Sequence, residues 1–167
     1  MHAVDMLSYG HQTVTEAIEG LNAAEWEQPG VCGHWSVKEI IAHLASYEVV
    51  LVEILQTILE PETAAPLLEK LLTGYESFND EQVLLRQAMT AAEQWDEYEL
   101  AHQKVMDLLR QVPQDKQRQA GILDWYGPEY DLEDFLVYMY YAHKREHAAQ
   151  IHVYRDQLAR VSQPETI

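Results

Sequence analysis

The sequence predicts an all-α protein, a four-helix bundle with a long connection between its second and third helices. Three observations lead to this fold class. The six prolines leave long proline-free blocks at 1–28, 30–60, 67–112 and 129–163, and proline is excluded from helix interiors. Each block is rich in Ala, Leu, Glu and Gln, which favour helix. Val and Ile recur at helical spacing, so no pair of strands is expected.

The second helix has the clearest start. Ser36 is suited to cap it, and Glu39 three residues later completes a capping box. Trp35 and Ile40 flank this box as a hydrophobic staple. The helix is expected to continue to about Leu59, because no proline or glycine interrupts it.

The first helix and the long connection have weaker signals. Apolar side chains near one face predict a first helix from about Asp5 to Leu21. The long connection covers residues 61–79, with a short helix expected at Pro66–Leu72. Its length allows the third helix to cross over, which would make the second and last helices neighbours.

The third block contains a second possible helix start, at Asp96 with Glu99 three residues later. The block is therefore expected to be two helices, 80–94 and 96–111, or one long kinked helix. A polar loop follows at 113–130. The last helix is expected from a cap at Asp131, with Asp134 three residues on and the end near Ala159.

Composition narrows the functional classes. The 167 residues suit a single domain over 1–167. The net charge of −17 is spread along the chain without a basic patch, which argues against nucleic acid and anionic membranes as partners. Apolar runs are too short for a membrane-spanning helix, and no signal peptide is recognised. Cys32, the single cysteine, cannot form an internal disulfide, which fits a cytoplasmic location.

His143 and His147 are four residues apart on the predicted last helix, so they share one face. Two such imidazoles can bind one metal ion, and His43 on the second helix is the candidate third ligand. Three histidines with an open position are typical of a catalytic zinc, but imidazole also suits other divalent ions. The expected cofactor is zinc, nickel, iron or manganese. Glu48 and Glu146 are candidate bases or outer partners of the ligands.

Simpler interpretations stay open. With eight histidines in the chain, a pair four apart also arises by chance, and His43 fits a core histidine between apolar neighbours. The zinc-protease motif H-E-x-x-H is excluded, because Lys144 follows His143. A di-iron bundle needs two E-x-x-H motifs, and only Glu99-Leu-Ala-His102 is found. The histidines outside the candidate triad are expected to be surface or core residues: His2, His11, His34, His102 and His152.

Two segments together resemble the DinB-like (YfiT-like) superfamily. Its members show W-S-x-x-[DE]-x-x-x-H-[LI] on the second helix, matched here by Trp35-Ser-Val-Lys-Glu-Ile-Ile-Ala-His-Leu-Ala-Ser-Tyr-Glu48, and a histidine pattern on the last helix, matched by His143-Lys-Arg-Glu-His147. The resemblance implies a bundle, often a homodimer, whose divalent metal is bound by His43 and this histidine pair. Tyr47 departs from the pattern, since many relatives have Trp there.

This superfamily includes transferases and isomerases that use mycothiol, bacillithiol or glutathione. The resemblance thus implies a metal-dependent S-transferase or hydrolase for a small electrophilic substrate, with a low-molecular-weight thiol as a second cofactor. The alternatives are a non-enzymatic protein that sequesters a small molecule in the same pocket, and a structural bundle that binds no metal. An anionic thiol would need nearby cations, for which Lys38, Lys144 and Arg145 are the candidates.

Overall fold

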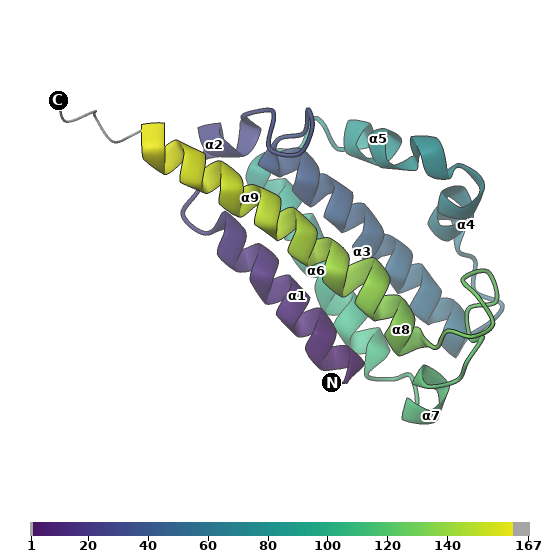
Figure 1. The fold of residues 1–167 in the computed structure, drawn as a ribbon. Helices are drawn as coiled ribbons and strands as arrows, with labels where there is room; N and C mark the ends of the chain where they lie inside the picture. The colour runs from purple at the N-terminus through teal and green to yellow at the C-terminus, as the bar shows by residue number, and fades with distance from the viewer. Residues whose placement is uncertain (1, 162–167) are drawn as a thin grey trace.

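The computed structural model describes residues 2–161. Within that range the regular structure is helical, apart from one isolated bridge between Cys32 and Trp35, so the predicted all-α class is confirmed. The bundle consists of four long helices (Figure 1): α1 (Ala3–Ile18), α3 (Val37–Leu59), α6 (Ala91–Leu109) and α9 (Ala142–Val161).

The long connection between the second and third long helices is present. It contains α4 (Pro66–Thr73) and α5 (Tyr75–Leu85), which lie outside the bundle beside α3 (Figure 1). The helix predicted at Pro66–Leu72 is therefore confirmed as α4. These two helices return the chain to the end of the bundle where α3 began, so α6 runs parallel to α3.

Side-chain contacts confirm the directions of the long helices. Lys38 near the start of α3 contacts Gln87 just before α6, and Glu48 further along α3 contacts His102 of α6. The order of the contacts along the last helix shows in the same way that α9 runs antiparallel to α3 and parallel to α1. α3 packs mainly on α6, and α9 mainly on α1, while α3 and α9 meet along a smaller contact. The second and last long helices are thus neighbours, as expected.

Two predicted helix starts are confirmed by reciprocal hydrogen bonds. The backbone N–H of Glu39 donates to Ser36 Oγ over 3.3 Å, and the Ser36 N–H donates to the Glu39 carboxylate over 2.7 Å. Asp131 and Asp134 form the same kind of box. α3 also ends at Leu59, as predicted. Each signal depends on residues three apart, so it can be read locally.

The last predicted helix is helical throughout but changes its hydrogen-bond pattern. α8 (Leu132–Leu136) continues into a π-helical segment, η1 (Val137–Tyr141), and then into α9. α9 extends slightly beyond the predicted end at Ala159, while Pro164 lies outside the described residues. Single π-helical turns within α-helices are frequent at functional sites, and this one directly precedes the turn that carries His143.

The beginning of the chain differs from the prediction. α1 ends at Ile18 rather than Leu21, because Gly20 adopts a φ of +79°, a left-handed conformation that terminates helices. A short helix, α2 (Ala23–Glu27), follows from a capping box at Asn22 and was not predicted. This segment crosses the end of the bundle between α1 and α3.

The break in the third block lies earlier than predicted. α6 begins after Thr90, whose Oγ accepts the Glu93 N–H over 3.2 Å, while the Glu93 carboxylate accepts the Thr90 N–H. Asp96, the predicted cap, lies inside α6. The predicted loop 113–130 contains a further short helix, α7 (Gln114–Gln117). Thr90 and Asp96, six residues apart, are both suited to cap a helix. The helix begins after Thr90, which directly follows a turn of the chain.

The bundle interior has two apolar clusters separated by a layer of polar residues. Met6 and Leu7 of α1 belong to one cluster, and Val14 and Ala17 belong to the other. α3 and α6 divide in the same way, while α9 contributes to the second cluster and the preceding α8 and η1 to the first. We define the polar layer as the buried or half-buried residues between these clusters: His11, His43, Glu48, His102, His143, Lys144 and His147. The predicted metal ligands thus lie at mid-height in the bundle.

α3 is the core helix of this arrangement. By length and composition alone it could cross a membrane, but 78% of its most apolar stretch is buried inside the bundle. The sequence had predicted no such segment. Packing against the other helices accounts for this composition, because a central helix is apolar on most sides.

Candidate metal centre

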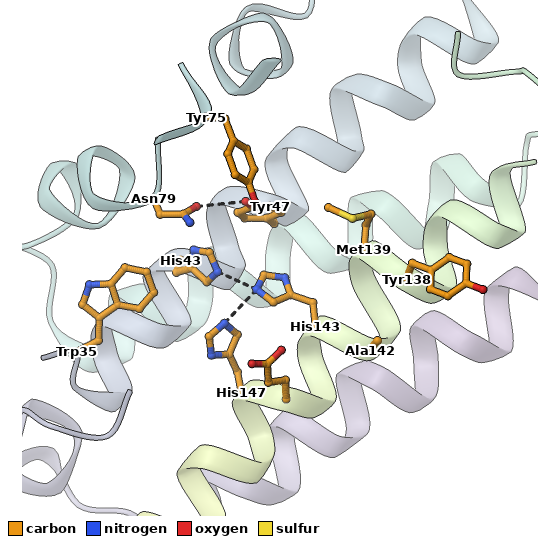
Figure 2. A pocket seen from close by; sticks show the side chains of 11 residues that line it. Trp35, His43, Tyr47, Tyr75, Asn79, Tyr138, Met139, Ala142, His143 and His147 are labelled. Carbon is orange, nitrogen blue, oxygen red and sulfur yellow. Dashed lines mark hydrogen bonds between the residues drawn. The ribbon is translucent and has the colours of Figure 1, made fainter. Parts of the chain in front are cut away.

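Three histidine side chains from two helices converge at one point (Figure 2). His43 Nε2 lies 2.9 Å from His143 Nε2, and His147 Nε2 lies 3.0 Å from the same atom. One ring nitrogen of each residue falls within 4.8 Å of the others. Metal–nitrogen bonds of about 2.0–2.1 Å hold nitrogens within roughly 4 Å of one another, so the two measured separations fit ligands of one ion.

The helices explain this convergence. His143 and His147 are one turn apart on α9, and His43 follows the capped start of the antiparallel α3. His147 Nδ1 lies 2.8 Å from Gln150 Oε1. An amide oxygen only accepts hydrogen bonds, so Nδ1 carries the hydrogen and Nε2 is left with a free lone pair. A partner on the second ring nitrogen is the usual arrangement for a ligand histidine.

The surroundings keep these imidazoles neutral. Burial, reinforced by His143 and His147, lowers the pKa of His43 to about 2. Burial, His147 and Lys144 lower the pKa of His143 to about 3. Burial also lowers the pKa of His147, although Gln150 acts in the opposite direction. Metal binding requires the neutral imidazole, so the donor set suits a divalent ion.

A pocket of about 350 Å³ opens over the three histidines (Figure 2). Trp35 and Tyr47 pack on the His43 ring, with centroid distances of 5.0 and 4.9 Å. Tyr47 is also anchored, since its hydroxyl donates to Asn79 Oδ1 over 3.2 Å. The walls are mostly aromatic or apolar, and the lining consists of Trp35, His43, Tyr47, Tyr75, Asn79, Tyr138, Met139, Ala142, His143, Glu146 and His147.

The three predicted cations do not line this pocket. Lys144 is buried with 1% of its surface exposed and faces the bundle interior, Lys38 pairs with Glu27, and Arg145 lies over the ring of Tyr141. Glu146 is the one acidic or basic side chain among the described lining residues besides the histidines. These cations are therefore not placed to contact an anionic thiol in the pocket, and that expectation was wrong.

Glu48, the candidate base or outer partner of the ligands, lies away from the pocket. It is fully buried, its Oε1 is 2.8 Å from Lys144 Nζ, and its Oε2 accepts His102 Nδ1–H over 3.0 Å. Burial alone would raise the pKa of Glu48, but the attraction of Lys144 and His102 outweighs it and lowers the value to about 2. Glu48 is thus a structural anion, and Glu146 is the carboxylate that reaches the pocket.

Two other histidines join the polar layer. His11 stacks on His102 with ring centroids 4.0 Å apart, and His11 Nε2 lies 2.9 Å from the Glu99 carboxylate. Burial, helped by His102 and Lys144, lowers the pKa of His11 to about 3. Both were expected to be surface or core residues, and both are indeed largely buried. Their proximity to the Glu48–Lys144 pair has no signal in the sequence.

Fold and site together define a helical-bundle protein with a candidate three-histidine metal centre. The chain belongs to the family of the mycothiol maleylpyruvate isomerase N-terminal domain, whose model matches residues 7–139. This family is a member of the DinB-like superfamily, in agreement with the resemblance. The match includes His43 and ends before His143 and His147. Searches of curated proteins and of solved structures found no significant match.

Proposed function

We propose that the protein is a metal-dependent enzyme, a thiol-dependent S-transferase or a hydrolase, that acts on a small electrophilic substrate. The observation that carries this proposal is the convergence of His43, His143 and His147 beneath an open pocket. Three protein ligands leave coordination positions for other molecules, which is typical of catalytic rather than structural zinc sites.

Each part of the site has a role in this proposal. The three histidines hold zinc, nickel, iron or manganese through Nε2. When bound, such an ion stabilises a thiolate or hydroxide near neutral pH. Trp35 and Tyr47 orient the His43 ring and shield it from water. The exposed Glu146 at the pocket can accept a proton from an incoming nucleophile.

The nucleophilic thiol is proposed to come from a small molecule. Cys32 is the single cysteine of the chain and does not line the pocket. Burial, with the nearby charge of Glu146, raises the pKa of the Cys32 thiol, and reactive cysteines have lowered pKa values. The name of the family supports mycothiol as the first thiol to test and maleylpyruvate as the first electrophile.

The test is conjugation by the metal-loaded protein. With a chlorinated aromatic substrate, the sulfur forms a bond to the ring carbon, chloride leaves with the bonding electrons, and the thiol proton passes to solvent. Protein loaded with each candidate metal is given maleylpyruvate or the chlorinated aromatic, and each is assayed with mycothiol, bacillithiol and glutathione, and with water alone for hydrolysis. We expect turnover that requires metal, is lost in His143→Ala and is retained in His152→Ala. Equal turnover without metal would reject the proposal.

A binding protein with the same pocket is the second candidate. This candidate is favoured because the described lining residues include no fixed cation that could hold an anionic thiol. Glu146 is the one obvious proton-transfer group among them. Small molecules that raise the melting temperature of metal-loaded protein without turnover would favour this candidate. The homodimer, the single domain over 1–167 and the cytoplasmic location stay predictions.

A further inference from the structure

Lys144 lies in the centre of the bundle, an unusual place for a lysine. Its Nζ is 2.8 Å from the buried Glu48 Oε1 and 5.5 Å from the centre of the Tyr98 ring. Glu48 also accepts a hydrogen bond from His102. The Lys144 side chain therefore reaches from α9 across to both α3 and α6.

The remaining long helix, α1, makes room for this side chain. A Cβ at Gly10 of α1 would lie 3.3 Å from Lys144 Cδ and 3.5 Å from Tyr141 Cδ2. The missing side chain thus allows the Lys144 stem to pass between α1 and the rest of the bundle. All four long helices contribute to the space that holds this one amino group.

A buried ion pair is weak evidence for net stability. Removing two charges from water costs more than their attraction often returns, and apolar replacements of buried ion pairs are frequently as stable as the original. The better-supported use of buried charges is to select one arrangement of the surrounding helices over others. Lys144 and Glu48 join α9 to α3, so the arrangement that they would select is that of these two helices.

The pair lies beside the candidate metal ligands. Lys144 follows His143 directly and precedes His147 by less than one turn, while Glu48 lies five residues after His43. About 140° of helix rotation separates five residues, so the ion pair and the ligands occupy different sides of the contact between α3 and α9. The pair can therefore hold the two helices from the interior while the histidines face the pocket.

Few contacts set the position of the ligand-bearing helices relative to each other. α3 packs mainly on α6 and α9 mainly on α1. Between α3 and α9 the described polar contacts are the histidine cluster and the Glu48–Lys144 pair, and just before α9 the Tyr140 hydroxyl of η1 donates to the Tyr47 carbonyl over 3.0 Å. A sliding of α9 along α3 would separate Glu48 from Lys144 and move the histidine ligands apart.

We propose that Glu48 and Lys144 are positioning residues, which fix the register of α9 against α3 so that the Nε2 atoms of the three histidines converge. This inference rests on the proposed metal site. Neither residue is a ligand, and neither contacts the pocket. Their effect is on the affinity and geometry of the site, and it acts through the helices.

The test separates metal affinity from folding. In the double variant Glu48→Gln/Lys144→Met both charges are removed, while the Gln oxygen still accepts from His102. The matched control is Arg86→Met/Glu97→Gln, which removes a half-buried ion pair between the α5 end and α6 that holds no ligand. Zinc affinity is measured by chelator competition, and the metal-free denaturation midpoint is measured separately.

We expect the double variant to bind zinc several-fold more weakly, because the pair no longer holds the ligand-bearing helices in register, with a metal-free midpoint close to that of the wild type. The visible absorption bands of the Co²⁺-loaded variant should shift, because the ligand geometry changes. The control should keep both the affinity and the bands of the wild type.

The outcomes are distinguishable. A wild-type protein that binds no ion overturns the proposed function and the inference with it. A folded double variant with wild-type zinc affinity and wild-type Co²⁺ bands overturns the inference alone. If the double variant does not fold without metal, Glu48→Asp decides, since it keeps both charges but shortens the reach to Lys144. A several-fold loss of affinity in Glu48→Asp supports positioning, and unchanged affinity overturns it.

Discussion

The Nε2 atoms of His43 and His143 lie 2.9 Å apart, although 100 positions separate the two residues in the chain. The crossover through α4 and α5 makes this contact possible, because it leaves α3 adjacent to α9 rather than diagonal to it. The rings are nearly perpendicular, with an interplanar angle of 79°. Two nitrogens aimed at a common point in this way are what a shared ion requires.

Metal content should follow the three histidines. Protein purified without chelator is expected to hold about one divalent ion per chain, because three imidazoles form one site. His43→Ala and His147→Ala should each reduce this to a small fraction, as measured by elemental analysis. His152→Ala, an exposed histidine on the same helix α9, is the control and should keep its metal. Full occupancy in both triad variants would rule out this ligand set.

The partner of His147 should tune the affinity. Gln150→Met removes the oxygen that accepts from His147 Nδ1, so the ring loses its fixed orientation. We expect zinc affinity to fall about 10- to 100-fold, as for other partners of ligand histidines. Gln157→Met makes the same change at an exposed site on α9 and should leave affinity unchanged. Equal affinities in the two variants would show that Gln150 does not orient His147.

The start of α3 should be sensitive to one hydroxyl. Ser36→Ala removes the acceptor for the Glu39 N–H and is expected to lower the free energy of unfolding by about 1 kcal/mol. Denaturant unfolding of metal-free protein measures this. Ser8→Ala is the control, since Ser8 is an exposed serine inside α1 whose hydroxyl bonds to a carbonyl four residues back, and alanine is the better helix former there. A Ser36→Ala midpoint equal to wild type would contradict the capping role.

Glu48 should make stability depend on acid pH. Its pKa is lowered from 4.5 to about 2 in the folded protein. A lowered folded pKa contributes stability that is fully present above the unfolded pKa and is lost as pH falls from about 4.5 towards 2. One pKa unit is worth about 1.4 kcal/mol, so the contribution is at most roughly 3.5 kcal/mol. Metal-free wild type should therefore approach Glu48→Gln in stability across this window.

The comparison with Glu48→Gln isolates this carboxylate from other acids, which titrate in both proteins. Lys144 of α9 and His102 of α6 are the charged or titratable groups that contact it, and His11 stacks on the far side of His102. A stability difference that stays constant from pH 5 to pH 2 would mean that Glu48 is not held ionised by these neighbours.

Much of the candidate site can be predicted from local sequence. The one-turn spacing of His143 and His147 puts both on one face, and the superfamily pattern around His43 supplies the third residue. The structure brings the three together, as the sequence predicted. The metal itself stays a prediction for the experiment on metal content.

Other features were predicted wrongly because they depend on distant contacts. Lys144 was a candidate cation for the pocket, yet Glu48, Gly10 and Tyr98 from three other helices provide its buried environment. Glu48 was a candidate base or outer partner of the ligands, but about 140° of helix rotation separates it from His43, and in the structure it faces α6 and α9. Helix periodicity separates Glu48 from the ligands, but which side chains it meets on that other side depends on packing across the bundle.

The sequence by itself determined the helical class, the starts of α3 and α8, and the pairing of two histidines on α9, since each depends on residues within four positions of one another. The tertiary structure alone decided that α3 runs parallel to α6, that Glu48 and Lys144 meet in the interior, and that Glu146 is the carboxylate at the pocket. The physical reason is that burial and electrostatic pairing are set by which helix faces meet, and those faces are brought together by packing across the whole bundle.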